Sequence, residues 1–124
     1  MKSQAKDILN KLPTGVYADV RIVEKESQDI ATKDGVVEAL NSSISIGYGV
    51  RVLKDGAWGF AGSNNFTKRG IEKTVKRAVE ISESSARCKD EDVVLASLAR
   101  PGLARLEATY KTPIKIDPFE VPIE

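Results

Sequence analysis

Histidine is absent from this sequence of 124 residues. It is the only side chain that ordinarily titrates near neutral pH, and it is the most common metal ligand in proteins. Its absence excludes a Ser-His-Asp triad, a Cys-His catalytic pair and a histidine-based zinc site within this chain. Carboxylate chemistry stays open, but it requires two carboxylates held together in a pocket.

The sequence also has few cysteines, no long apolar run and no excess of one charge. Cys88 is the single cysteine, so no internal disulfide forms, which suits a reducing compartment. No stretch approaches the roughly 20 apolar residues that span a bilayer, and residues 1–7 lack the apolar run of a signal peptide. Because 19 basic residues balance 18 acidic ones, the overall field attracts neither nucleic acid nor an anionic membrane. We therefore expect a cytoplasmic protein with one core and no membrane partner.

Two segments have the apolar spacing of amphipathic helices. Residues 3–12 form a short N-terminal helix, which Ser3 caps and which Pro13 and Gly15 end. Residues 67–87 form a long helix, with Thr67 as its N-cap and Ile71 on its apolar stripe. The long helix is expected to cover one face of a sheet.

Alternating apolar and polar residues predict an antiparallel, four-stranded meander between the two helices. The four strands expected are residues 16–33, 36–43, 44–52 and 57–62. Asp34-Gly35 and Asp55-Gly56 are strong signals for two-residue hairpin turns. The alternation weakens at residues 25–28, where we expect a bulge or a bend. The fold class is therefore α+β.

The hairpin around Asp55-Gly56 is rich in glycine and aromatic residues. The predicted cross-strand pairs are Leu53 with Trp58, Val52 with Gly59, Arg51 with Phe60 and Val50 with Ala61. One face then sets large residues against small ones, so that a helix can lie close to the strands. The other face carries Trp58 and Phe60 beside Arg51, with glycines that the rings can shield.

Arg51, Trp58 and Phe60 are therefore the candidate interaction surface. Either the first helix or a further domain would cover this face. The competing interpretation is a well-packed hairpin without any ligand.

The last part of the chain differs in character. Prolines recur at positions 101, 113, 118 and 122, and residues 110–116 have an extended pattern. Residues 93–98 are apolar and suit a short strand or a helical turn. We therefore predict a domain over residues 1–88 and a connecting segment over residues 89–124, which forms an extended C-terminal tail toward another region.

A weaker candidate site lies on the long helix. Lys73, Lys76 and Arg77 give this helix a basic face that could contact an anion such as a nucleic acid phosphate. Glutamates interrupt this face and no aromatic residues accompany it, so a solvated helix face is the favoured interpretation. Nucleic acid is not an expected partner.

Four segments in this order resemble the N-terminal region of the TldD/PmbA family, whose members are described as modulators of DNA gyrase and as metallopeptidases. The segments are Tyr17-Ala18-Asp19-Val20-Arg21, Gly47-Tyr48-Gly49-Val50-Arg51-Val52, Asp55-Gly56-Ala57-Trp58-Gly59-Phe60-Ala61 and Ala78-Val79-Glu80-Ile81. Residues 113–122 also resemble the family's connection into its next region. The resemblance implies a full-length zinc peptidase that cleaves unfolded or modified peptides as a homo- or heterodimer. It also implies that the zinc site, an HExxxH helix with a further cysteine, lies beyond the matched region.

Without histidine, no position here inherits a ligand of that zinc site, and Cys88 does not correspond to the family's cysteine. The resemblance therefore implies a structural and interaction domain with no cofactor and no activity by itself. Its partners would be the rest of its own polypeptide or a related subunit. The alternative is a free-standing protein-binding module that uses the Trp58/Phe60 face.

Overall fold

The computed structural model describes residues 1–95 and 107–122. The chain divides into two compact units, Met1–Val94 and Leu95–Glu124. In the first unit the elements are α1 (Lys2–Leu9), β1 (Tyr17–Lys33), β2 (Val36–Lys54), β3 (Ala57–Ser63) and α2 (Lys68–Ala86). This order confirms the α+β class. Within the described residues of the second unit, one short 3₁₀ helix is present, Pro118–Glu120.

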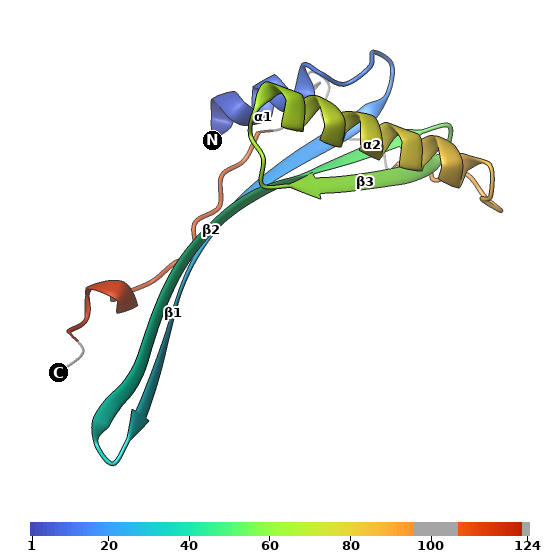
Figure 1. Ribbon diagram of the computed structural model, residues 1–124. Coiled ribbons are helices and arrows are strands. Elements are labelled where there is room, and N and C mark those ends of the chain that lie inside the picture. The colour runs from blue at the N-terminus through green and yellow to red at the C-terminus, as the bar shows by residue number, and fades with distance from the viewer. Residues whose placement is uncertain (96–106, 123–124) are drawn as a thin grey trace. The chain divides into compact units, whose positions relative to one another are not determined.

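The sheet is antiparallel with the strand order β1-β2-β3, so the prediction of four strands was wrong (Figure 1). The strands expected at 36–43 and 44–52 are one continuous strand, β2. The physical reason is that the ladder with β1 runs unbroken through this point. Ser42, Ser43 and Ile44 pair with Gln28, Ser27 and Glu26, so the chain does not turn between the two predicted strands.

Both hairpin turns are confirmed. Asp34 and Gly35 have φ of 49° and 77°, and Asp55 and Gly56 have φ of 51° and 71°. Two successive positive φ values define the turn whose twist matches that of paired strands. The pairs between β2 and β3 also agree with the prediction, including Arg51 opposite Phe60 and Val52 opposite Gly59.

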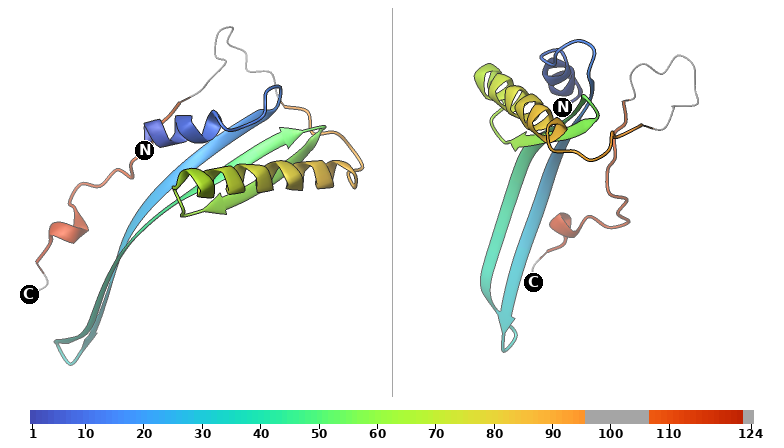
Figure 2. Two further views of the ribbon diagram at one scale, coloured as in Figure 1. Left: turned by 45° about the horizontal axis from the view of Figure 1, so that its top comes forward. Right: turned by 90° about the vertical axis from the view of Figure 1, so that its right-hand side faces the viewer.

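Beyond the three-stranded part, β1 and β2 continue as a two-stranded ribbon (Figures 1 and 2). We call residues 24–46 the arm. β3 pairs with β2 only from Tyr48 to Lys54, so the arm has no third strand. The predicted bulge at residues 25–28 was wrong, because pairing there is regular and the register shifts between Ala31 and Thr32 instead. The weak alternation at 25–28 reflects polar residues on both faces of an exposed ribbon.

Both helices pack on the same face of the sheet, as the side view in Figure 2 shows. Ile8 of α1 lies in one buried cluster with residues of the sheet and of α2. The other buried members are Tyr48, Val50, Val52, Ile71, Val75 and Ala78. The interpretation that α1 covers the aromatic face was therefore wrong. Both helices have one apolar stripe, and the Val50/Val52 face offers the apolar surface on which both stripes can be buried together.

The ends of the helices follow local capping chemistry. The Oγ1 of Thr67 accepts a hydrogen bond of 3.1 Å from the backbone N–H of Gly70, which confirms the predicted N-cap of α2. The predicted Ser3 cap was wrong, since α1 begins at Lys2 after Met1 with no side-chain cap. α1 also ends at Leu9, because the N–H groups of Lys11 and Leu12 bond three residues back in a tighter turn.

The second unit has little regular structure among its described residues. Residues 107–116 contain no helix or strand, and the extended tail stays a prediction. The carboxylate of Asp117 accepts a 3.0 Å hydrogen bond from the N–H of Phe119 and so caps the 3₁₀ helix. Residues 93–95 also lack helix and strand, and the rest of the element expected at 93–98 lies outside the described residues.

Candidate functional site

The candidate site is the face of the sheet that points away from α1 and α2. Side chains opposite one another in an antiparallel pair share a face. Asp19 of β1 and Phe60 of β3 both lie opposite Arg51 of β2. Tyr17 of β1 and Trp58 of β3 likewise both lie opposite Leu53. We call this the aromatic face. No element of Met1–Val94 packs on it, whereas the opposite face holds the buried core.

Arg51 is the centre of this face. Its guanidinium lies 4.4 Å from the ring centroid of Trp58, which confirms the expected stacking of the arginine on an aromatic ring. The same guanidinium donates from Nε to Asp19 Oδ2 at 2.8 Å, and it forms an ion pair of 2.7 Å with that oxygen. Tyr17 meets Trp58 edge to face at 5.9 Å between centroids. Arg51 and Trp58 are thus held in place by their neighbours before any partner binds.

Sequence reasoning missed Asp19 and Tyr17 as members of this group. The Asp34-Gly35 turn places Lys33 opposite Val36, and the same register without a shift would place Asp19 opposite Val50. The shift between Ala31 and Thr32 moves Asp19 to Arg51. A bulge inside an exposed ribbon leaves little sequence signal.

Phe60 is the most exposed ring of the face, at 60% of its full accessible area. Its ring lies over the bare backbone of Gly49, where a β-carbon would stand only 2.7 Å from Phe60 Cε2. The glycine therefore allows the ring to lie flat on the sheet, as the sequence predicted. Aromatic side chains, phenylalanine among them, are enriched in protein–protein interfaces.

Next to Phe60 the aromatic face forms an open groove of about 790 Å³. Its lining includes Gly47 and Gly49 on the floor and Asp19, Arg21, Lys25 and Arg51 at the sides. Asp19 and Arg51 neutralise one another, but the side chains of Arg21 and Lys25 have no hydrogen bond or ion pair within the described part of the chain. The groove therefore combines exposed apolar side chains, Val23 and Phe60, with the positive charges of Arg21 and Lys25. We call it the basic groove.

The structure places the weaker candidates apart from the basic groove. Lys73, Lys76 and Arg77 are exposed on α2, which lies on the other side of the sheet. Lys76 contacts Glu80 at 3.7 Å, one turn along the same helix. A phosphate contact at this helix face stays a prediction.

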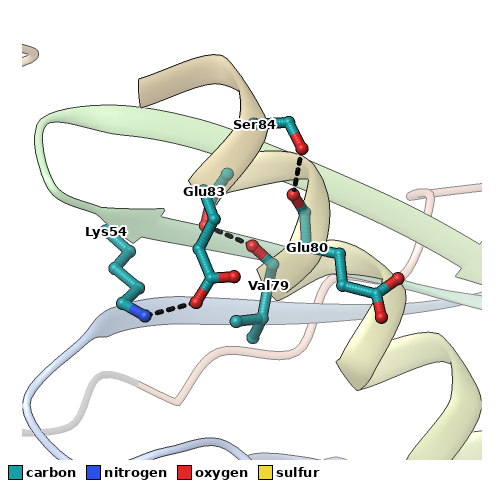
Figure 3. A network of polar contacts seen from close by, with 6 residues as sticks. Lys54, Val79, Glu80, Glu83 and Ser84 are labelled. Carbon is teal, nitrogen blue, oxygen red and sulfur yellow. Dashed lines mark hydrogen bonds and ion pairs between the residues drawn. The ribbon is translucent and has the colours of Figure 1, made fainter. Parts of the chain in front are cut away.

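A second polar group fastens α2 to the sheet (Figure 3). Lys54 of β2 donates to a carboxylate oxygen of Glu83 at 2.5 Å. This hydrogen bond, followed by the attraction of the lysine charge, lowers the pKa of Glu83, and the same hydrogen bond raises the pKa of Lys54. Both side chains remain partly exposed, so the pair positions the helix more than it stabilises the fold.

The described residues hold no group of three or more Cys, Asp or Glu side chains that could bind a metal ion. Cys88 is exposed and unpaired with any other cysteine. No helix in the described ranges is both long and apolar enough to cross a membrane.

Comparisons with known proteins identify the family. The sequence model described as PmbA/TldA metallopeptidase domain 1 matches residues 18–82, which is more than half of the chain. A metalloprotease of Methanocaldococcus jannaschii is 34% identical over 113 residues, which are 91% of this chain and 24% of that protein. A metalloprotease of Methanothermobacter thermautotrophicus is 35% identical over 54 residues, 44% of this chain and 12% of that protein.

The chain spans a quarter or less of the length of these relatives. The matched residues include most of α2 and the hairpin that forms the aromatic face. The chain therefore belongs to the TldD/PmbA metallopeptidase family.

Proposed function

We propose that this chain is a non-catalytic interaction domain of a TldD/PmbA-type metallopeptidase. Its task is to pack through the aromatic face on the catalytic region, or on a related subunit, and to form part of the wall around the site of proteolysis. The observation that carries this proposal is the aromatic face itself. Arg51 and Trp58 are held in position there and Phe60 is 60% exposed, while no element of Met1–Val94 covers them.

Zinc belongs to the longer protein in this proposal. Residues 1–95 and 107–122 offer no cluster of ligands that fits a zinc ion, and the sequence has no histidine. The part of the Methanocaldococcus jannaschii relative that this chain does not match is about three quarters of its length. We therefore assign binding and orientation to this domain, and the metal chemistry to that remaining part. A cytoplasmic location, which suits the unpaired Cys88, is part of the same proposal.

The first test is metal content and peptidase activity of the purified 124-residue chain. We expect no stoichiometric zinc by elemental analysis, and no cleavage of an unfolded protein such as reduced casein. The matched control is a longer polypeptide in which this domain precedes an HExxxH region, which should bind zinc. Zinc bound one to one by the chain alone, or cleavage that a chelator abolishes, would overturn the proposal.

A free-standing binding module is the second candidate function. The observation that favours it is that Met1–Val94 is a compact unit with its own buried core. Trp58 fluorescence separates the two candidates, because the indole lies in the aromatic face. A shift on adding the HExxxH region as a separate chain supports the peptidase domain, whereas a shift only with an unrelated protein supports the module.

A further inference from the structure

The positive charges of the basic groove are not explained by the packing of Arg51, Trp58 and Phe60. Arg21 and Lys25 line the groove and are exposed, and their side chains have no hydrogen bond or ion pair within the described residues. The one carboxylate in the lining, that of Asp19, is already paired with Arg51. The groove therefore carries two positive charges that the described residues do not neutralise.

The register of the strands sets the spacing of these two charges. Arg21, Val23 and Lys25 follow one another at two-residue intervals on β1, so their side chains share the aromatic face. Their partners on β2 are the small residues Gly49, Gly47 and Ser45. At about 3.3 Å per residue, the two charges are roughly 13 Å apart along the strand. The side chain of Val23, which is 54% exposed, lies between them.

The small residues of β2 leave the floor of the groove open. A β-carbon at Gly47 would meet only the carbonyl oxygen of Ser63, at 3.6 Å, and Gly47 does not have a positive φ. The described residues therefore do not require a glycine here, in contrast to Gly49, which lies under the ring of Phe60. A glycine inside a strand often marks a place where a ligand or another backbone approaches closely. The floor thus has room for a polypeptide backbone.

We propose that the basic groove binds an extended, acidic segment of a peptide. Two carboxylates of the segment pair with Arg21 and Lys25, and an apolar side chain midway between them packs on Val23. An extended peptide rises by about the same 3.3 Å per residue as a strand, so the recognised pattern is acidic-x-apolar-x-acidic. Opposite charges select the segment and set its register, while the apolar contact supplies burial.

The inference rests on the proposed function, because it names a substrate class for the peptidase. The chain has no histidine, and its described residues hold no cluster of metal ligands. The segment bound here is therefore not the segment that is cleaved. It lies to one side of the scissile bond in the substrate, and the groove holds it while the catalytic region acts.

Fluorescence anisotropy with a short labelled peptide tests the proposal on the 124-residue chain. The peptide is Thr-Glu-Thr-Leu-Thr-Glu-Thr with a neutral coumarin label and an amidated C-terminus, so its two glutamates are its only carboxylates. We expect binding that high salt weakens. Glutamine in place of both glutamates, or the two glutamates placed side by side, should weaken binding at least about tenfold, because charged contacts are lost. A glutamine peptide with a free C-terminal carboxylate should also bind weakly.

Variants of the chain locate the binding. Arg21→Gln with Lys25→Gln should weaken binding of the glutamate peptide at least about tenfold. Arg21→Glu with Lys25→Glu should instead prefer a peptide in which lysines replace the glutamates. Gly47→Val places a side chain on the floor and should weaken binding with no change of charge. The matched control, Lys73→Gln with Arg77→Gln, removes two charges from α2 and should leave binding unchanged.

Circular dichroism checks that every variant folds. Each of four results would overturn the proposal: no binding by the unmodified chain, equal binding of either glutamine peptide, undiminished binding by the Gly47→Val chain, or equal weakening by the α2 control. Such a failure is distinct from a failure of the proposed function, which zinc content and peptidase activity test separately.

Discussion

At the scale of single residues, Gly59 sets how closely α2 approaches the sheet. A β-carbon at this position would lie 2.8 Å from Ser82 Cβ and closer still to the carbonyl oxygen of Ala78. Both neighbours belong to the buried side of α2, and the obstructing carbonyl is backbone, which cannot rotate away. The small residue opposite Val52 is therefore a requirement of helix packing, as the large-against-small pattern in the hairpin predicted.

We expect Gly59→Ala to lower the free energy of unfolding by about 1–3 kcal/mol, because the helix must move off the sheet. Urea denaturation followed by Trp58 fluorescence measures the change. Gly47→Ala is the control, since its β-carbon would meet only the carbonyl oxygen of Ser63 at 3.6 Å. Equal stability of the Gly59→Ala and Gly47→Ala variants would show that α2 does not rest on Gly59.

The Lys54–Glu83 pair makes stability depend on pH. The pKa of Glu83 is lowered in the folded chain by the hydrogen bond from Lys54 and then by the lysine charge. Its contribution is therefore complete above the ordinary glutamate pKa of 4.5 and is lost as the pH falls through the lowered value. The pKa of Lys54 is raised, so its contribution is complete below 10.5 and is lost as the pH rises through the raised value.

We expect Glu83→Gln to be less stable than the unmodified chain at neutral pH, by a small amount because both groups are partly exposed. The difference should vanish in acid, where Glu83 is protonated in both states. Urea midpoints measured from pH 2 to pH 8 give the profile, with Glu80→Gln as the control because its 3.7 Å contact with Lys76 is looser. A difference that persists in acid would mean that the glutamine disturbs packing instead.

At the scale of elements, the arm and the three-stranded part of the sheet have different roles. The buried residues of β2 are Tyr48, Val50 and Val52, all of which lie beyond the arm. Pairing with β3 begins at Tyr48 as well. The core therefore depends on the last third of β2. In the arm, β2 pairs with β1 alone, through the backbone ladder and a few side-chain hydrogen bonds such as that between Ser27 and Ser43.

We expect a shortened chain, in which an Asn-Gly turn replaces residues 27–43, to keep the stability of the core. Residues 26 and 44 are directly opposite in the ladder, so a two-residue turn closes the hairpin there without changing the register. Thermal unfolding should remain cooperative, with a midpoint close to that of the full chain. A midpoint lowered by more than about 8 °C, which for a domain of this size corresponds to over 1 kcal/mol, would assign the arm to the core.

At the scale of the whole molecule, the question is the residue at which the first compact unit ends. The compact unit extends to Val94, whereas the composition of the sequence suggested a boundary at residue 88. Residues after 88 contact the β2–β3 turn. The N–H of Val93 donates to the carbonyl oxygen of Gly56 at 2.8 Å, and Lys89 pairs with Asp92 at 2.6 Å while also bonding the carbonyl of Asp55.

We expect a chain of residues 1–94 to unfold at the same urea concentration as the full chain. A chain of residues 1–88 lacks the contacts to the turn and should be less stable by about 1 kcal/mol, the usual net value of one or two hydrogen bonds. Val93→Pro in residues 1–94 isolates the backbone bond, because proline has no N–H. If residues 1–88 and 1–94 unfold together, the boundary predicted from composition is supported.

Much of this domain follows from the sequence by itself, because the deciding interactions are local. Asp-Gly in two places determines two tight turns, and the Asp55-Gly56 turn determines the pairing of Arg51 with Phe60. Thr67 and the apolar stripe determine α2. The absence of histidine determines that this chain supplies no histidine ligand to the zinc site of its family.

Only the tertiary structure decided which distant segments meet. The bulge between Ala31 and Thr32 shifts β1 by one residue, which brings Asp19 to Arg51 and Val20 to the core side with Val50. A one-residue shift costs little free energy at the bulge itself. The register is therefore decided by the burial of a whole face of the strand. Burial likewise places α1 beside α2, since both apolar stripes need the same Val50/Val52 surface. The aromatic face is thereby left uncovered by any element of Met1–Val94.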